Sequence, residues 1–188
     1  METDGLRVTP VKIAEIKVSN SQDEILVAYS LGSCIGVCLW DPVCCAGGMA
    51  HVFLPRPRQC TYVAASGNSE VIPGFFHPQE PNEQPGKYGT TAVSNLAHSL
   101  VRIGCKRERL MAAIAGGANV IPGLSSPFGE VGVMNLKAVE QALADERIEV
   151  VGRDTGGNYG RSMYLYVSKG VVRVTSTTGP EKEFRFKE

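Results

Sequence analysis

A cysteine and a histidine stand where two apolar segments of the chain could present them together. Gly32-Ser33-Cys34 interrupts a long apolar stretch, and His51 lies seventeen residues after the cysteine, in the next apolar segment. Gly32 removes a side chain where the backbone leaves a buried strand, so the thiol of Cys34 can project from the strand end. A neighbouring imidazole could then take the thiol proton, the sulfur could attack an acyl carbon, and backbone N–H groups could hold the oxyanion. The residues also allow a second interpretation, in which Cys34 is a small buried apolar side chain and His51 an ordinary strand histidine.

The segments around these two residues predict strands. Almost continuous apolar sequence over 24–40 predicts two strands, or one bent strand, buried on both sides, and 47–54 predicts another short strand. The seventeen-residue separation suits adjacent antiparallel strands joined by a turn at 41–48. The second half of 7–18 alternates apolar and polar residues, as a half-buried strand does. Further strands are expected at 110–115, 148–151, 163–167 and 171–174.

Two helices and one long loop complete the pattern. Apolar residues recur at helical spacing over 92–101, and Gly104 is suited to the position just after a helix. Asn135 is expected to cap the start of a second helix. Residues 56–86 hold five prolines and few periodic apolar residues, which predicts a long loop leaving the strand of the histidine. More strands than helices, with no internal repeat, indicate an α+β fold.

Composition and charge limit the function classes. The 188 residues, 43% hydrophobic and 20% charged, suffice for a single domain spanning 1–188 and argue against disorder. Nineteen basic residues balance nineteen acidic ones, so the electrostatic signature of nucleic-acid binding is absent. No apolar run is long enough to cross a bilayer and the first residues do not resemble a secretory signal, so we expect a cytoplasmic protein without membrane insertion. The six cysteines are then expected to be free thiols, and no two have the Cys-x-x-Cys spacing of a zinc site.

Several segments, taken in order, resemble the signature of the CheD-type chemoreceptor glutamine deamidases. The segment 31–42 carries the cysteine, and 48–55 carries the histidine. The other matching segments are Pro85–Ala92, Ala115–Ala118, Gly132–Asn135 and Asp154–Arg161. The resemblance covers most of the chain, from about Glu24 to Thr178, and the ordered combination is specific although each motif is short.

The resemblance implies a fold, a reaction and a site. The implied fold is a three-layer α/β/β sandwich, similar to the deamidase domain of cytotoxic necrotizing factor. The implied reaction is hydrolysis of receptor glutamine side chains to glutamate and ammonia. By matching position, Cys34 is the nucleophile and His51 the base, and the reaction passes through a thioester. Because His51 can stabilise a thiolate, we also expect Cys34 to be alkylated faster than the other five thiols near neutral pH.

The same resemblance implies which other molecules take part. No metal ion or organic cofactor is expected. The implied partners are the cytoplasmic helices of chemoreceptors, as substrate, and a CheC-type phosphatase of the chemotaxis response regulator.

One departure from the family pattern concerns the third residue of the site. The family usually has a threonine five or six residues before the cysteine, thought to orient the histidine, and here Tyr29 and Ala28 hold those places. Ser30 is the nearest hydroxyl, and on a regular strand it faces the same way as Cys34. We therefore expect Ser30 to be the residue that could supply the missing hydrogen bond, the alternative being that its hydroxyl bonds only to backbone.

Two rival functions stay open. The missing threonine is compatible with a catalytically weak adaptor that binds and stimulates the CheC-type phosphatase. The cysteine-rich stretch 34–60 is compatible with a thiol redox or metal protein. Cys38 and Cys105 are expected in the core, and the pair Cys44-Cys45 has no indicated role. Arg161 is expected either to pair with Asp154 or to line the cleft.

Overall fold

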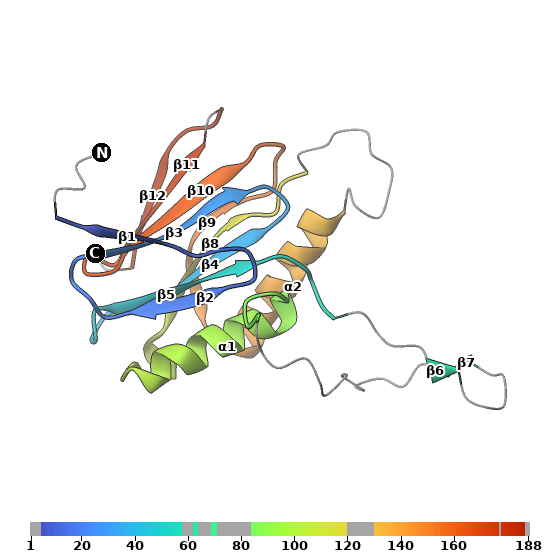
Figure 1. Cartoon of the computed structure of the whole chain (residues 1–188), viewed down its shortest axis with the longest axis horizontal. Coiled ribbons are helices and arrows are strands. Elements are labelled where there is room, and N and C mark those ends of the chain that lie inside the picture. Colours follow the sequence, from blue (N-terminus) through green and yellow to red (C-terminus); the bar gives the residue numbers. More distant parts are fainter. Residues whose placement is uncertain are drawn as a thin grey trace.

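The computed structural model describes residues 5–57, 62–63, 69–70, 84–119, 130–176 and 178–186. Within them the chain forms two five-stranded sheets, one two-stranded sheet and two α-helices (Figure 1). This is the mixed α+β class that the sequence predicts. Most of the loop expected at 56–86 lies outside the described residues. Neither α-helix of the described part is long and apolar enough to cross a membrane.

The first sheet contains the strands from both ends of the described chain. Its strands are β1 (Arg7–Pro10), β3 (Glu24–Leu31), β10 (Arg161–Tyr166), β11 (Val171–Ser176) and β12 (Lys182–Arg185). They lie in the order β1-β3-β10-β11-β12, with β1 parallel to β3 and every other neighbour antiparallel. The hairpin of β10 and β11 matches the one that the sequence predicts, whereas β12 was not predicted.

The second sheet carries the candidate residues. Its strands, in spatial order, are β2 (Ile16–Ser19), β5 (Ala46–Val52), β4 (Ile35–Asp41), β8 (Met111–Gly116) and β9 (Glu149–Thr155). Only β8 and β9 run parallel. The central strands β4 and β5 are buried along their whole length, which explains why their sequences are almost continuously apolar. A separate two-stranded sheet pairs β6 (Tyr62–Val63) with β7 (Ser69–Glu70).

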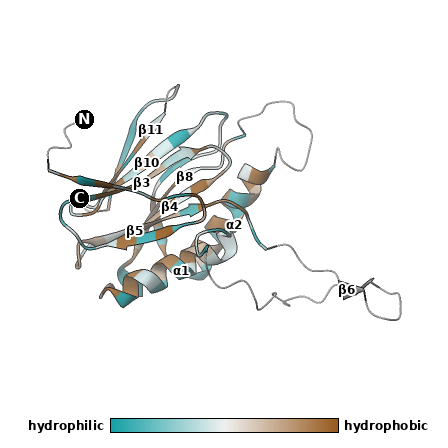
Figure 2. Cartoon of the chain, viewed as in Figure 1, coloured by the Kyte–Doolittle hydropathy of each residue, from teal (hydrophilic) through white to brown (hydrophobic). Residues whose placement is uncertain are grey.

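Both faces of the second sheet are covered. The helices α1 (Gly89–Arg102) and α2 (Val131–Asp145) pack on one face, where they share a core with alternate residues of β4. The other face packs against β3, β10 and β11 of the first sheet in a second core. Figure 2 shows apolar and polar residues alternating along α1, as expected for a helix with one buried face. A short 3₁₀ helix, η1 (Arg107–Arg109), follows α1.

The chain passes between the two sheets in two places that the sequence pattern does not reveal. The expected strand over 7–18 is two strands, β1 in the first sheet and β2 in the second, because the chain turns at Ala14, whose φ is 67°. The apolar stretch 24–40 is two strands, β3 and β4, which is the first of the two predicted alternatives, and the two strands lie in different sheets. Burial on both sides hides this change, since an apolar run does not show which sheet its residues join.

The expected start of the second helix was wrong. The α2 helix begins at Val131, one turn before Asn135, so Asn135 lies inside the helix and does not cap it. Its first turn fits closely against the end of β8, because a Cβ at Gly132 would lie 2.7 Å from the carbonyl oxygen of Ala118. The amide of Asn135 instead bonds to backbone outside its own helix. The C-terminal prediction for α1 is confirmed, since Gly104 follows the helix with φ 103°.

Candidate active site

Cys34 lies one residue before β4 and faces the first sheet. Its side chain belongs to the core between the two sheets, together with Cys38 and Trp40 of the same face of β4. Cys34 is 8% exposed, and Gly32 and Ser33 beside it are partly exposed. A substrate group that reaches the thiol must therefore enter at the short link between β3 and β4.

Backbone hydrogen bonds from the end of β8 hold this link in place. The carbonyl of Cys34 accepts a hydrogen bond from Gly117 N–H at 2.8 Å, and the carbonyl of Gly32 accepts one from Ala118 N–H at 2.8 Å. Only glycine fits at position 116, where φ is 111° and a Cβ would lie 2.1 Å from the Cys34 carbonyl oxygen. The Gly116-Gly117 pair is thus a docking point for the backbone of the cysteine.

Asn135 joins the ends of the two strands that carry the candidate residues. Its Nδ2 donates to the Ser33 carbonyl at 2.9 Å and to the Phe53 carbonyl at 3.1 Å. Ser33 directly precedes Cys34, and Phe53 directly follows β5. Asn135 is fully buried, and its Oδ1 has no partner among the described residues. The α2 helix therefore fixes the spacing between the cysteine and histidine strands through one amide.

His51 faces the same core as Cys34. The strands β4 and β5 are antiparallel neighbours as predicted, with His51 directly opposite Gly36, two residues beyond the cysteine. Facing pairs point to one side of a sheet, and positions 34 and 36 share a face, so the thiol and the imidazole are diagonal neighbours. Gly36 leaves no side chain between them: a Cβ there would lie 2.8 Å from Leu31 and 2.9 Å from Met163.

A backbone carbonyl orients the imidazole. The Nδ1 of His51 lies 3.2 Å from the carbonyl oxygen of Val11, in the segment that crosses from the first sheet to the second. The same segment bonds the backbone of His51, through Ala14 N–H to its carbonyl and through its own N–H to the Glu15 carbonyl. A carbonyl only accepts, so Nδ1 carries the proton and Nε2 keeps its lone pair. Nε2 is buried and has no partner among the described residues.

Burial favours the neutral form of both Cys34 and His51. It raises the pKa of the Cys34 thiol above the usual 9.0. It also lowers the pKa of His51 below 6.5, although the Val11 carbonyl acts in the opposite direction. A neutral thiol beside a neutral imidazole is therefore the favoured state at neutral pH. This arrangement does not support the expectation of a preformed thiolate that makes Cys34 the fastest thiol to be alkylated.

The structure places Ser30 away from the expected role. Ser30 is exposed and has a φ of 57°, near the irregularity in the pairing of β3 with β10, so the regular alternation assumed for it does not hold. No hydrogen bond joins its hydroxyl to His51 within the described residues; the Val11 carbonyl makes the contact to the ring. Ala28, in the place of the family threonine, is fully buried in the core between the sheets.

Of the other residues that the sequence singled out, some are placed by the structure and others lie outside the described residues. Arg161 pairs with Asp154 at 2.9 Å, the first of the two alternatives, and Cys38 is fully buried as expected. Cys60 and His77 lie outside the described residues. Sequence reasoning missed Val11 and the true role of Asn135. Any residue type offers a backbone carbonyl, so the sequence could not single out Val11. Asn135 lies within a segment that matches the family pattern, and this position could have indicated its role.

Comparisons with known proteins agree on one family. The family model described as CheD chemotactic sensory transduction matches residues 73–176. The probable chemoreceptor glutamine deamidase CheD of Symbiobacterium thermophilum is 37% identical over 178 residues, 94% of this chain and 97% of that protein. The chemoreceptor glutamine deamidase CheD of Thermotoga maritima is 37% identical over 84% of this chain and 85% of that protein. The probable chemoreceptor glutamine deamidase CheD of Archaeoglobus fulgidus is 31% identical over 91% and 94%.

Among solved structures, the hypothetical protein YfiH of Bacillus licheniformis aligns with 77% of this chain and 58% of its own, at 14% identity and a TM-score of 0.34. A TM-score this low carries no argument about a common fold.

Proposed function

This chain belongs to the CheD family, and from that premise we propose that it hydrolyses glutamine side chains of chemoreceptors to glutamate and ammonia, with Cys34 as nucleophile and His51 as base. The proposal takes its substrate from the names of the relatives. Its mechanism depends on one observation in this chain. The imidazole has its Nδ1 bonded to the Val11 carbonyl and an unpartnered Nε2 on the face that it shares with the thiol.

The first half-reaction follows from the neutral pair. As the sulfur of Cys34 attacks the carboxamide carbon, Nε2 of His51 takes the thiol proton. The Val11 carbonyl stabilises the imidazolium through the Nδ1–H bond. The imidazolium then returns the proton to the departing nitrogen, so that ammonia leaves and a thioester remains. Proton transfer in concert with attack removes the need for a thiolate in the resting enzyme.

The link before β4 supplies groups that could stabilise the oxyanion. The carbonyls of Gly32 and Ser33 bond to Ala118 and Asn135, on the side of β8 and α2. In a trans peptide the N–H points opposite to the carbonyl, so the N–H groups of Ser33 and Cys34 point away from those partners. Neither N–H has a hydrogen-bond partner within the described residues. We assign these two N–H groups to the tetrahedral oxyanion.

The second half-reaction uses the same residues. A water molecule, deprotonated by Nε2 of His51, attacks the thioester carbon, and the bond to sulfur breaks. The product is the glutamate side chain, and the sulfur of Cys34 recovers its proton from the imidazolium. These steps involve only Cys34, His51 and water.

Three further parts of the proposal concern the whole chain. We assign residues 1–188 to one deamidase domain, supported by the core that the two sheets share and by relatives that align with 94% of the chain. We assign its layers to the three-layer α/β/β sandwich of the cytotoxic necrotizing factor deamidase domain, supported by helices on one face of the second sheet and the first sheet on the other. A cytoplasmic location is the corresponding proposal, since chemoreceptor signalling helices lie there.

The decisive experiment measures ammonia release from a chemoreceptor cytoplasmic fragment, with mass spectrometry to locate the new glutamates. Wild type should release ammonia, Cys34→Ala should release none, and His51→Ala should be slower on the order of 10²–10⁴-fold. Cys38→Ala is the matched control, since it removes a thiol from the same core between the two sheets. Full activity in folded Cys34→Ala would overturn the assignment of the nucleophile.

A catalytically weak adaptor is the second candidate function. The observation that favours it is the buried Ala28 where the family usually has threonine. In that function the chain would bind a CheC-type phosphatase and stimulate it, with little release of ammonia. Phosphatase activity that rises with added wild type and with Cys34→Ala alike, while wild type deamidates no receptor fragment, would select the adaptor.

A further inference from the structure

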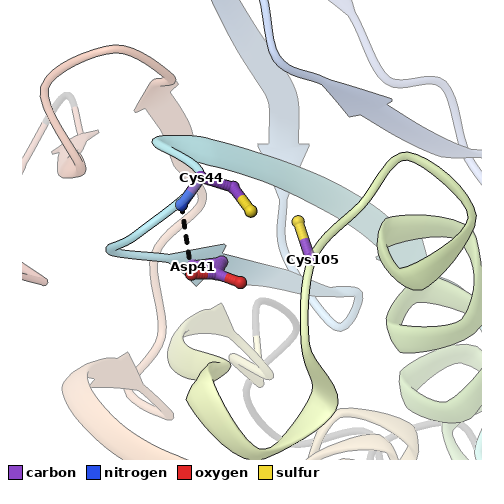
Figure 3. A group of neighbouring side chains, drawn as sticks. All are labelled: Asp41, Cys44 and Cys105. Atoms are coloured by element: carbon purple, nitrogen blue, oxygen red, sulfur yellow. Dashed lines mark hydrogen bonds between the residues drawn. The ribbon is translucent and has the colours of Figure 1, made fainter.

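Two cysteines outside the active site lie together at the opposite end of β4. Cys44 is in the turn between β4 and β5, and Cys105 follows α1. Their Sγ atoms and the carboxylate of Asp41 all lie within 4.8 Å of one another. Figure 3 shows the two sulfurs pointing toward each other from these separate segments. Neither thiol takes part in the proposed deamidation.

One buried carboxylate fixes both backbone segments. Asp41, which is fully buried, accepts a hydrogen bond from Cys44 N–H at 3.3 Å, drawn as the dashed line in Figure 3. It also accepts one from Lys106 N–H, next to Cys105, at 3.0 Å. The Cys44 thiol donates to the Gly104 carbonyl at 3.2 Å, which places its sulfur over the segment of the second cysteine. The thiols are thus held near each other before any reaction.

The charges at this cluster disfavour a metal ion. Arg109 donates to the Asp41 carboxylate through Nε at 3.0 Å and Nη2 at 2.6 Å, and Nη2 also lies 3.3 Å from the sulfur of Cys44. A guanidinium among the ligand atoms repels a divalent cation.

The two thiols differ in their environments. Cys44 is partly exposed, whereas Cys105 is 4% exposed. Burial, together with the negative charge of Asp41, raises the pKa of Cys105 to about 12. A dissolved oxidant therefore meets Cys44 first, and Cys105 is placed to attack the product.

We propose that Cys44 and Cys105 form an oxidation site, which a peroxide converts into an intramolecular disulfide. The sulfur of Cys44 attacks one peroxide oxygen, the O–O bond breaks, and a sulfenic acid and one water form. The sulfur of Cys105 then attacks the sulfenic sulfur, the S–O bond breaks, and a second water leaves with the thiol proton. Two electrons pass from the two sulfurs to one hydrogen peroxide. The disulfide links the turn between the two active-site strands to the end of α1.

The neighbouring Cys45 provides a matched control. Cys44 packs against the core beneath the helices, whereas Cys45 packs against the core between the sheets. Adjacent positions in this turn thus point to opposite sides of the second sheet, and only Cys44 faces Cys105.

The test treats the full chain with hydrogen peroxide, blocks free thiols with an alkylating agent, and maps disulfides by mass spectrometry without reduction. We expect wild type and Cys45→Ser to give a peptide that links positions 44 and 105, with a mass two hydrogens below the reduced peptides and reversible by dithiothreitol. Cys44→Ser and Cys105→Ser should lose that peptide. The wild-type map needs no substitution, so it tests the site even if a variant fails to fold.

Other outcomes would overturn the proposal. These are a disulfide that involves mainly Cys34 or Cys45, oxidation of Cys44 without a disulfide, and no reaction at all. A zinc ion that binds in a one-to-one ratio and protects Cys44 and Cys105 from alkylation would instead establish a metal site.

Discussion

At the scale of single residues, the proposed active site combines a thiol and an imidazole, and burial favours the neutral form of each. Burial lowers the pKa of His51 below 6.5, so the base stays unprotonated to more acidic pH than a free histidine. Burial also raises the pKa of Cys34, so the thiol proton is still present at neutral pH to be transferred. The pair is therefore suited to attack with concerted proton transfer.

The pH dependence of the reaction tests this state. Protonated His51 cannot accept the thiol proton, so kcat/KM should fall at acidic pH with a midpoint below 6.5. The measurement is kcat/KM for ammonia release across pH, with circular dichroism at each pH to show that the fold persists. A midpoint at or above 6.5 would mean that His51 is not the base or that burial does not control it.

The hydroxyl of Ser30 provides a second test at this scale. Since the Val11 carbonyl orients His51, we expect Ser30→Ala to change kcat by less than the roughly three- to tenfold that one neutral hydrogen bond could contribute. Ala28→Thr, which restores the family residue in the core, is the comparison. A larger loss in Ser30→Ala, with unchanged thermal stability, would return Ser30 to the site.

The sequence could predict that Cys34 and His51 lie on neighbouring strands, but not which groups hold them in place. Cys34 and His51 stand out because a thiol and an imidazole are uncommon and occur here in segments with a family resemblance. Val11 could not be found in this way, since any residue offers a carbonyl and only the path of the backbone brings this one to the ring. The expectation that Ser30 faces the same way as Cys34 assumed a regular strand, and the φ of 57° at Ser30 breaks that alternation.

At the scale of elements, α2 acts on the site through Asn135. Replacing the buried Asn135 by leucine leaves the Ser33 and Phe53 carbonyls without their donor, so Asn135→Leu should lower the free energy of unfolding by about 1–3 kcal/mol. Displacement of the two strands should also lower kcat, on the order of tenfold to a hundredfold, with little change in KM. Steady-state kinetics and urea denaturation measure the two effects.

A similar amide on α1 provides the control for this prediction. Asn95 donates to the Pro85 carbonyl at 2.9 Å and contacts neither active-site strand through that bond. Asn95→Leu should cost stability without lowering kcat. Equal losses of kcat in the two variants would show that Asn135 has no special positioning role.

Element prediction succeeded where one periodicity dominates. The apolar spacing over 92–101 predicted α1, and the hairpin of β10 and β11 followed from two short apolar runs around a glycine turn. The start of α2 was missed because the clearest capping residue, Asn135, has its amide committed to Ser33 and Phe53. The assignment of β1 and β2 to separate sheets was missed because alternation along a strand does not identify its neighbours.

At the scale of the whole molecule, a buried charge cluster ties the two sheets together. Asp154 of β9 in the second sheet bonds Arg161 of β10 and Lys182 of β12, both in the first, at 2.9 Å and 2.8 Å. Arg161 is almost fully buried, and its guanidinium also stacks on Tyr159, with Cζ 4.2 Å from the ring centroid. Loss of the carboxylate would leave a buried cation without its partner.

Asp154→Asn should therefore lower the free energy of unfolding by about 3–5 kcal/mol. Lys182→Met, at a side chain that is 40% exposed, should cost no more than about 1 kcal/mol. Burial alone would raise the pKa of Asp154, but the bonds from Lys182 and Arg161 outweigh it and lower the pKa below 3.8. The stabilisation is thus present above pH 3.8 and lost as the pH falls further. Urea denaturation at several pH values measures these effects, and equal costs for the two variants would contradict the prediction.

The contact between Asn135 and Ser33 also determines when the chain can become active during its synthesis. The cysteine and histidine strands leave the ribosome early, but Asn135 follows Ser33 by 102 residues. Contacts between residues this far apart form late in folding, because they must close long loops. The hairpin of β4 and β5 alone would carry both reactive groups, yet without α2 it would have no amide to space its strands. A nascent or partly folded chain is therefore catalytically silent, and deamidase activity should begin only when both sheets and the second helix have assembled.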